Sequence, residues 1–538
     1  MNLFNGDTLL GWVIQILKFI FQIILKILVF TGAWIILIFG LFDSFVIGKI
    51  FPNFAKDHLK GYVIYHNILW ILMLLFMIYW TIRNVIRLVT KNPDFSPFKQ
   101  FIYKQKDKIP NAKEAINALS VPTPKGFIFG KYGNSYIVKP KKLDGHIIVI
   151  GGAGSGKSSC IAIPSIISWH TRIFAIDIKG ELYKKAGFKC NKVKIFNPLS
   201  PNTYTYDPYY LLSTSRNPVQ DAREIAQAIV QKPQDIRDPF WIDGAQNILT
   251  GCILHFYNTG LSFIRTITTM QATPIPQLIQ TITDSPIPEA RMFVTQFVGM
   301  DTKTLSGIFA ELSNHVMVFA TDPDIQNCLS NARTFTPDDL ENNYSIFIQL
   351  PEDKLEQWKG IQTLIVNQFM KHFERRNEEN AKPVLFLLDE FPRLGKIETA
   401  INGLATLRSK KITICLIVQS LAQLDAIYGK ENRQVIADNC QYKAILNATD
   451  ADTQEYFSRI VGTYEKNKKS TNANSDPFGF KPNQGTSRTT EEKRMIKPED
   501  FATLKKIVLL TPFGFLQVDK TPYFNDPNLT RTDRQVQH

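Results

Sequence analysis

Gly151-Gly-Ala-Gly-Ser-Gly-Lys-Ser-Ser159 matches the pattern G-x-x-x-x-G-K-[S/T] at every fixed position. Its glycines allow a tight turn in which backbone N–H groups face phosphate oxygens. A helix beginning near Lys157 would add the positive end of its dipole. The apolar run His146–Ile150 precedes the loop and predicts a short buried strand. Together these features predict a strand–loop–helix unit that binds nucleotide phosphates.

Each part of this loop has an expected role toward ATP and Mg²⁺. Lys157 would reach the β- and γ-phosphates and take part in catalysis, and Ser158 would ligate Mg²⁺. A flexible Gly/Ser linker is the alternative, but linkers are not flanked by a strand and by an apolar segment such as Cys160–Ile167. The residues predicted to bind the nucleotide are Gly151, Gly152, Ala153, Gly154, Ser155, Gly156, Lys157, Ser158 and Ser159.

A phosphate-binding loop of this kind needs a carboxylate on a nearby strand, and Val384–Leu388 followed by Asp389 and Glu390 supplies one. A short apolar run that ends in two acids is typical of a central parallel strand, whose carboxyl end is where α/β sheets bind ligands. Asp389 would hold Mg²⁺ through water, and Glu390 would polarise the attacking water as general base. The alternative is a strand followed by a solvated acidic turn.

Two further apolar runs, Arg172–Ile176 and Lys411–Val418, predict strands of the same sheet. Gln419 follows the second run and could sense the γ-phosphate or the attacking water, although a helix-capping role is also open. Arg408 lies just before that run and could be an arginine finger supplied to a neighbouring subunit. Its alternative is a solvated arginine at a helix end.

The amino-terminal part is strongly apolar. Residues 9–47 and 62–82 are each long enough to span about 30 Å of hydrocarbon as a helix. A cleaved signal peptide is not expected, because the first run lacks a short apolar core followed by a small-residue cleavage site. Basic residues after the second run, from Arg83 to Lys108, place both termini in the cytoplasm.

Several motifs stand in one order along the chain. Asp177-Ile-Lys-Gly-Glu-Leu182, Asp389-Glu-Phe-Pro-Arg-Leu-Gly395 and Val418-Gln-Ser420 follow the anchor and the loop. This combination resembles the type IV secretion coupling proteins of the TraG/TraD type, although Ile178 stands where that family has a proline. The resemblance implies a RecA-like ATPase that forms a homohexameric ring with sites at subunit interfaces. Arg408 stands where the family carries its arginine finger.

The predicted fold class is α/β, a RecA-like P-loop ATPase domain with an inserted all-helical lobe, preceded by transmembrane helices. Few strand-like runs occur between Tyr209 and Asn343, where apolar residues recur at helical spacing. Residues 463–495 are polar and basic, which predicts a disordered loop. The expected divisions are an anchor at 1–90, the ATPase domain at 91–208 and 344–538, and the lobe at 209–343.

Composition bears on the partners. The chain has 62 Lys and Arg against 48 Asp and Glu, a net charge of +14 that favours nucleic acid or a phospholipid surface. The six cysteines show no zinc-ligand spacing, and the eight histidines are isolated. Cysteine or histidine catalysis is therefore not predicted.

We expect an ATP hydrolase in the bacterial inner membrane, multi-pass, with its ATPase domain in the cytoplasm. It would drive single-stranded, relaxase-linked DNA to the channel components of a type IV secretion system. The alternatives are the same motor exporting effector proteins, and a septal chromosome-segregation DNA pump. A membrane-bound kinase is less favoured, because the sequence offers no acceptor pocket or lid.

Overall fold

The structure is a computed structural model, and it describes residues 79, 112–233, 236, 238–330, 333–474 and 483–530. The predicted membrane spans at 9–47 and 62–82 fall outside these residues, apart from Tyr79. Among the residues that are described, no helix combines the length and the apolar character needed to cross a membrane.

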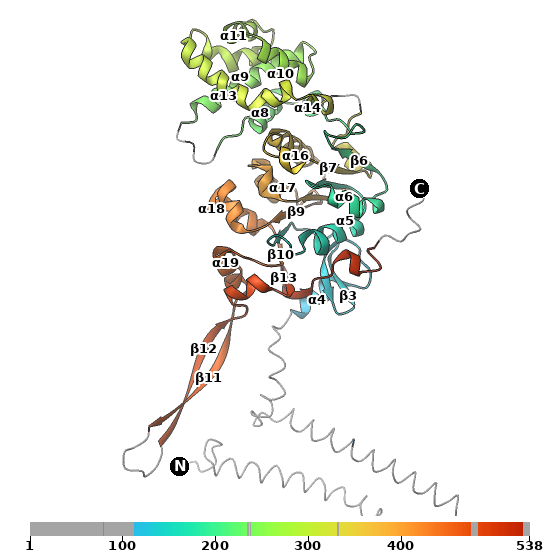
Figure 1. Cartoon of the computed structure of the whole chain (residues 1–538), viewed down its shortest axis with the longest axis vertical. Coiled ribbons are helices and arrows are strands. Elements are labelled where there is room, and N and C mark those ends of the chain that lie inside the picture. Colours follow the sequence, from blue (N-terminus) through green and yellow to red (C-terminus); the bar gives the residue numbers. More distant parts are fainter. Residues whose placement is uncertain are drawn as a thin grey trace, which may run out of the picture. The chain divides into compact units, whose positions relative to one another are not determined.

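Most of the described strands belong to one 12-stranded sheet (Figure 1). Seven neighbouring strands are parallel, and the other five extend the sheet from β10 by antiparallel pairing. The parallel strands, in spatial order, are β10 (Tyr442–Ile445), β4 (Ile147–Ile150), β9 (Ile412–Val418), β8 (Val384–Leu388), β5 (Ile173–Ile176), β7 (Ser345–Ile348) and β6 (Val193–Phe196). The antiparallel strands are β13 (Lys506–Thr511), β14 (Gly514–Asp519), β2 (Phe127–Tyr132), β3 (Ser135–Lys139) and β1 (Ser120–Val121).

The parallel strands are buried on both faces, which explains their continuous apolar sequences. In β4, Ile147 and Val149 belong to one hydrophobic core, and Ile148 and Ile150 belong to the other. Figure 1 shows α5 and α6 on one side of the sheet and α16, α17 and α18 on the other. These helices are α5 (Ile163–Trp169), α6 (Glu181–Ala186), α16 (Lys359–Glu374), α17 (Glu398–Thr406) and α18 (Leu421–Asn439). The predicted strands at 146–150, 172–176, 384–388 and 411–418 are confirmed to within one residue at each end.

A set of helices is inserted between β6 and β7, which are adjacent strands of the sheet. The bridge between Thr205 and Thr334 brings the two ends of the insertion side by side. Its longest members carry a shared core, to which α9 contributes Ile248, Leu249 and Cys252. The inserted helices are α7 (Tyr210–Thr214), α8 (Pro218–Ile229), α9 (Phe240–Asn258), α10 (Phe263–Ala272), α11 (Ile275–Thr283), α12 (Pro288–Val294), α13 (Thr302–Thr321), α14 (Pro323–Cys328) and α15 (Asp338–Glu341). We call α7–α15 the helical insertion.

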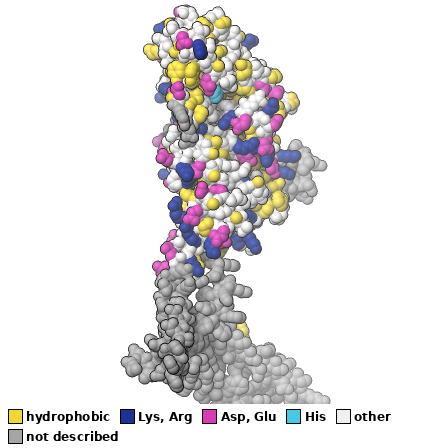
Figure 2. Space-filling model, turned by 60° about the vertical axis from the view of Figure 1, so that its left-hand side comes forward, with side chains coloured by type: hydrophobic (Ala, Val, Ile, Leu, Met, Phe, Trp, Pro, Cys, Tyr) yellow, Lys and Arg dark blue, Asp and Glu magenta, His cyan; other side chains and the backbone are white. Residues whose placement is uncertain are grey.

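The charges on the visible surface are mixed. Figure 2 shows lysine and arginine side chains interspersed with acidic ones over the described part of the face in view. The net charge of +14 is thus not gathered into one basic patch on that face.

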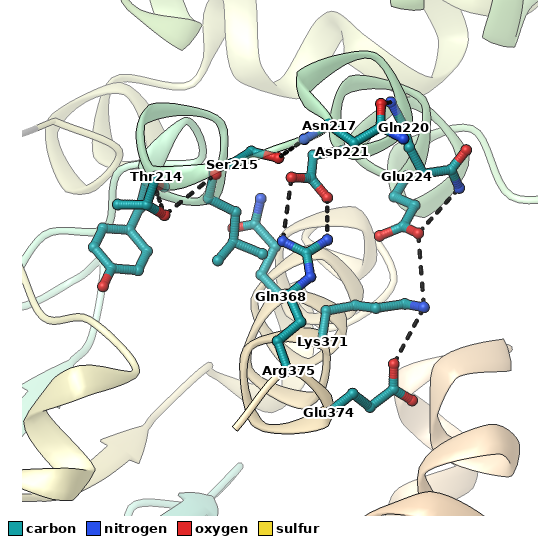
Figure 3. A network of polar contacts seen from close by, with 12 residues as sticks. Thr214, Ser215, Asn217, Gln220, Asp221, Glu224, Gln368, Lys371, Glu374 and Arg375 are labelled. Atoms are coloured by element: carbon teal, nitrogen blue, oxygen red, sulfur yellow. Dashed lines mark hydrogen bonds and ion pairs between the residues drawn. The ribbon is translucent and has the colours of Figure 1, made fainter. Parts of the chain in front are cut away.

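Ion pairs join the helical insertion to the sheet domain where α8 meets α16 (Figure 3). Arg375 contacts the buried carboxylate of Asp221 through Nη2 at 2.5 Å, while Lys371 lies between Glu224 and Glu374 at 3.6 and 3.3 Å. Asp221 is only 2% exposed, and Arg375 is the cation that its carboxylate contacts. The contact fixes α8 against a helix that packs on the central strands.

The sequence prediction for residues 463–495 needs correction. The structure places two paired antiparallel strands there, β11 (Thr463–Asn474) and β12 (Asn483–Arg494), in register from Thr463 opposite Arg494 to Asn474 opposite Asn483. The polar composition gives no sign of these strands, because a ladder of backbone hydrogen bonds can form without an apolar face. The short strands β6 and β10 were not predicted either, since four residues carry little periodicity.

Candidate functional site

A pocket of about 580 Å³ lies at the carboxyl ends of β4, β9, β8 and β5. Parallel strands bring their carboxyl ends to one edge of a sheet, so residues far apart in sequence meet there. The lining residues are Ala153, Gly154, Ser155, Gly156, Lys157, Ser158, Ser159, Asp177, Lys179, Glu181, Leu182, Glu352, Asp389, Glu390, Arg393 and Gln419.

The loop after β4 has the backbone geometry that its glycines allow. Gly154 and Gly156 have φ values of +69° and +98°, a region that L side chains rarely adopt. The helical segment η1 (Lys157–Ala162) begins directly after Gly156 and continues into α5. Gly151 and Gly152 lie behind the pocket lining, where their N–H groups donate to the Val418 carbonyl and the Asn447 Oδ1. The residues from Ala153 to Ser159 form the wall itself.

Lys157 extends over the loop that precedes it. Its Nζ donates to the carbonyls of Gly151 and Gly152, the second at 2.9 Å. Burial lowers the pKa of Lys157, and the negative charges of Asp389 and Glu390 oppose this shift. The amine is thus a half-buried cation that faces two carboxyl groups across the pocket.

Asp389 follows β8 and is the most perturbed acid of the pocket. Burial raises its pKa to about 6, and the neighbouring charge of Glu390 adds to that effect. Its Oδ1 accepts the Glu390 N–H at 3.0 Å. Ionising a carboxyl group in this position costs free energy unless a cation is nearby. The ionised Asp389 would therefore favour the binding of a cation.

Glu390 begins the turn η5 (Phe391–Leu394) with a left-handed φ of +48°. Its Oε2 accepts from Arg393 Nη1 at 2.8 Å, and the same nitrogen donates to Glu352 Oε1 at 2.7 Å. Arg393 lies within the motif Asp389–Gly395, whereas Glu352 lies outside every motif found in the sequence. Neither could be paired from sequence, because Glu352 comes from the loop that follows β7.

Gln419 and Arg408 lie at opposite ends of β9. Gln419 follows the strand and lines the pocket, and its N–H donates to Gln423 Oε1 at 3.3 Å. Arg408 precedes the strand, is exposed, and is not part of this pocket. Since β9 runs from Ile412 to Val418, about 20 Å of strand separates them. Arg408 therefore does not face the nucleotide loop of its own chain.

Asp177 directly follows β5 and begins the motif Asp177–Leu182. Its carboxylate accepts the N–H groups of Leu182 and Tyr183 at 3.0 and 2.9 Å, which fixes the start of α6. Burial raises the pKa of Asp177, and these hydrogen bonds oppose the rise. A third acid thus stands beside Asp389 at the same edge of the sheet.

Comparison with known proteins gives a consistent result. The family model described as "Type IV secretory system Conjugative DNA transfer" matches residues 99–538. VirD4 of Agrobacterium fabrum is 26% identical over 431 residues, which cover 76% of this chain and 63% of VirD4. A probable conjugal transfer protein TraG of Sinorhizobium fredii is 24% identical over 335 residues, 59% of this chain and 52% of that protein. The chain thus spans less than two thirds of either relative.

Solved structures share the mixed α/β fold. The unbound conjugative coupling protein TrwB aligns with a TM-score of 0.63 at 15% identity, over 79% of this chain and 93% of that one. The same protein in complex with ADP and Mg²⁺ aligns with a TM-score of 0.61 at 15% identity, over 78% and 95% of the two chains. At this identity the likeness concerns the fold.

Proposed function

The chain belongs to the type IV secretory system conjugative DNA transfer family, and we propose that it is an ATP-driven coupling protein that moves DNA toward a secretion channel. The observation that carries this proposal is the pocket in which Lys157, Asp389 and Gln419 meet at one edge of the sheet. A glycine loop, a cation and a carboxylate on neighbouring strands are the parts that phosphoryl transfer needs.

The residues present fit ATP with Mg²⁺. Gly154 has open space where a side chain would begin, so phosphate oxygens can approach its backbone. In the described part of the chain, no three Asp, Glu, His or Cys side chains form a metal cage. That fits Mg²⁺, which is usually bound through one or two carboxylates and the substrate's own phosphates. Among its relatives by fold, TrwB has been solved with ADP and Mg²⁺.

We assign the roles as follows. The backbone from Gly151 to Ser159 would hold the phosphates, and Lys157 would neutralise the β- and γ-phosphates. Ser158 and Asp389 would hold Mg²⁺, whose charge polarises the phosphate. Glu390 would accept a proton from the attacking water, and Gln419 would orient that water. Each of these residues except Gly151 and Gly152 lines the pocket, which supports the assignment.

Arg408 fits a role in trans. It is exposed at the amino end of β9, away from its own pocket, so it could reach the nucleotide of a neighbouring subunit. A homohexameric ring would bring one subunit's Arg408 to the next subunit's site, where it would stabilise the charge that develops on the phosphate. The ring is thus part of the proposal.

The remaining assignments concern location and organisation. We propose that residues 1–90 anchor the chain in the bacterial inner membrane through two helices, with the ATPase domain in the cytoplasm. Residues 91–208 and 344–538 would form a RecA-like ATPase domain, and 209–343 an all-helical lobe. The helices α7–α15 between adjacent strands β6 and β7 support that division.

DNA is the proposed cargo, single-stranded and linked to a relaxase. Support comes from the family description and the net charge of +14. The test measures ATP hydrolysis by the full chain in detergent, with and without single-stranded DNA. Lys157→Ala is the blank, and Lys232→Ala is the matched control, because Lys232 is an exposed lysine paired with Asp243 outside the pocket.

We expect activity above the blank that rises with DNA, and a control that behaves like the wild type. ATP hydrolysis that does not change with DNA would contradict the proposal that DNA is the cargo, but not the proposal that the chain hydrolyses ATP. No activity above the blank, in a sample that binds nucleotide, would contradict the proposed hydrolysis.

A further inference from the structure

Arg393 connects two carboxylates at the rim of the nucleotide pocket. A single nitrogen, Nη1, makes both contacts, to Glu390 at 2.8 Å and to Glu352 at 2.7 Å. The side chains are 36% exposed for Arg393, 19% for Glu390 and 54% for Glu352. Ion pairs this exposed contribute little to folding stability, so a purely structural role would be a weak one.

The backbone that carries Arg393 is held at both ends. The Arg393 N–H donates to the Glu390 carbonyl at 2.8 Å, which closes the turn. At the other end, the Leu394 carbonyl accepts from Thr363 Oγ1 at 3.0 Å, and the Gly395 carbonyl accepts from the Tyr428 hydroxyl at 3.3 Å. These hydrogen bonds fix the backbone from which the Arg393 guanidinium reaches Glu390.

Gly395 contributes a second restraint. Its φ is +83°, and an added Cβ would lie 2.3 Å from Lys359 Cε. The left-handed backbone therefore favours glycine at the end of the segment from Glu390 to Gly395. These restraints act on the backbone and leave the Glu390 side chain able to rotate. Arg393 is the cation that contacts this side chain directly.

The charges around Glu390 come from several elements. Lys157 projects from η1, Lys179 lies in the turn before α6, and Asp389 is the preceding residue. When a nucleotide and Mg²⁺ occupy the site, Lys157 is engaged by phosphate and Asp389 by the metal in the assignment above. Arg393 then remains as the cation that contacts Glu390 directly.

We propose that Arg393 is a positioning residue that holds the Glu390 carboxylate at the rim of the pocket, while Glu352 keeps the guanidinium from turning onto the nucleotide. The proposal rests on the function proposed above, in which Glu390 accepts the proton of the attacking water. It assigns Arg393 no contact with the nucleotide.

The test compares Arg393→Ala and Arg393→Lys in the full chain, with Arg494→Ala as the matched control. Arg494 also pairs with a glutamate, Glu455, at comparable exposure and outside the pocket. We expect Arg393→Ala to lower kcat on the order of tenfold, less than the roughly 10²-fold or more that loss of a positioned base costs. Nucleotide affinity should stay within about twofold, because the role is played through Glu390.

Two readouts separate positioning from a structural role. In Arg393→Ala, kcat should fall while KM for ATP stays within about twofold, because the loss concerns the step that Glu390 serves and not nucleotide binding. Arg393→Lys should restore most of kcat, since one nitrogen makes both contacts and an ammonium can replace it.

Thermal stability without nucleotide gives a measurement independent of activity. The stability that Arg393→Ala loses relative to the wild type should shrink as pH falls from about 6 to 3, because Arg393 lowers the pKa of Glu352 and the ion pair is lost once that carboxyl is protonated. A parallel pH course for both proteins would overturn the proposal, as would an unchanged kcat or a large loss of nucleotide affinity. A wild-type chain no more active than Lys157→Ala would instead refute the proposed hydrolysis, and the stability course would still decide the pairing.

Discussion

Replacing Asp389 by asparagine should make the nucleotide-free protein more stable while abolishing its activity. Burial and the Glu390 charge raise the Asp389 pKa from 3.8 to about 6, so the folded state opposes ionisation of this carboxyl. One pH unit corresponds to about 1.4 kcal/mol, which sets an upper bound of about 3 kcal/mol at neutral pH. Asp389 is half-buried, and solvent screening lowers the expected gain to about 1–2 kcal/mol.

The pH dependence has a definite sign. Because the folded pKa lies above the unfolded one, the wild type carries no penalty below about pH 4, where Asp389 is protonated in both states. The penalty grows as pH rises through about 4 to 6 and is complete above about pH 7. The asparagine variant escapes it and keeps the Oδ1 that accepts the Glu390 N–H.

The assay is thermal unfolding without nucleotide at several pH values, with Asp438→Asn as control. Asp438 is an exposed acid on α18, so its replacement should give no pH-dependent gain. The gain of Asp389→Asn should reach on the order of 2 °C at pH 8. It should reverse with ADP and Mg²⁺, which stabilise the wild type more. A variant that melts at or below the wild-type temperature at pH 8, or a gain that ignores pH, would refute the reasoning.

Three other variants test separate parts of the molecule. Lys157→Ala should abolish ATP hydrolysis and weaken nucleotide binding, measured by turnover and by titration, because it removes the cation proposed to neutralise the β- and γ-phosphates. Arg408→Ala should keep nucleotide binding but lose hydrolysis in the assembled ring, and normal turnover by the variant would contradict the role in trans. Arg375→Ala should lower the free energy of unfolding by about 1–3 kcal/mol, because it leaves the buried Asp221 carboxylate without its cation. Urea unfolding measures that loss, and adding Asp221→Asn should recover part of it.

The backbone around the proposed nucleotide site could be predicted where the residues of the site stand next to one another in sequence. The run 151–159 carries its glycines, lysine and serines together, and Asp389 directly follows an apolar strand. A contiguous pattern of this kind predicts the local backbone conformation, because all the residues that determine it are neighbours in sequence. Four of the parallel strands could be found for the same reason, because burial on both faces leaves an uninterrupted apolar run.

The contacts that complete the site could not be predicted in this way. Glu352 reaches Arg393 only because β7 and β8 both flank β5, and Asn447 reaches Gly152 only because β10 lies beside β4. These pairings depend on strand order, which no local pattern contains. The hairpin of β11 and β12 was missed for another reason, since its ladder is made of backbone atoms and its polar side chains resemble those of a loop.

The bridge between Thr205 and Thr334 has a consequence for how the family can diversify. The chain leaves the sheet after β6 and returns to the adjacent strand β7, so the helical insertion is topologically a connection between two neighbouring strands. The cost of closing a loop grows only slowly with its length, so helices can be added, lost or exchanged beyond the bridge with little effect on strand register. Natural variation and grafting experiments can therefore exchange helices between Thr205 and Thr334, provided that the contact of α8 with α16 is kept.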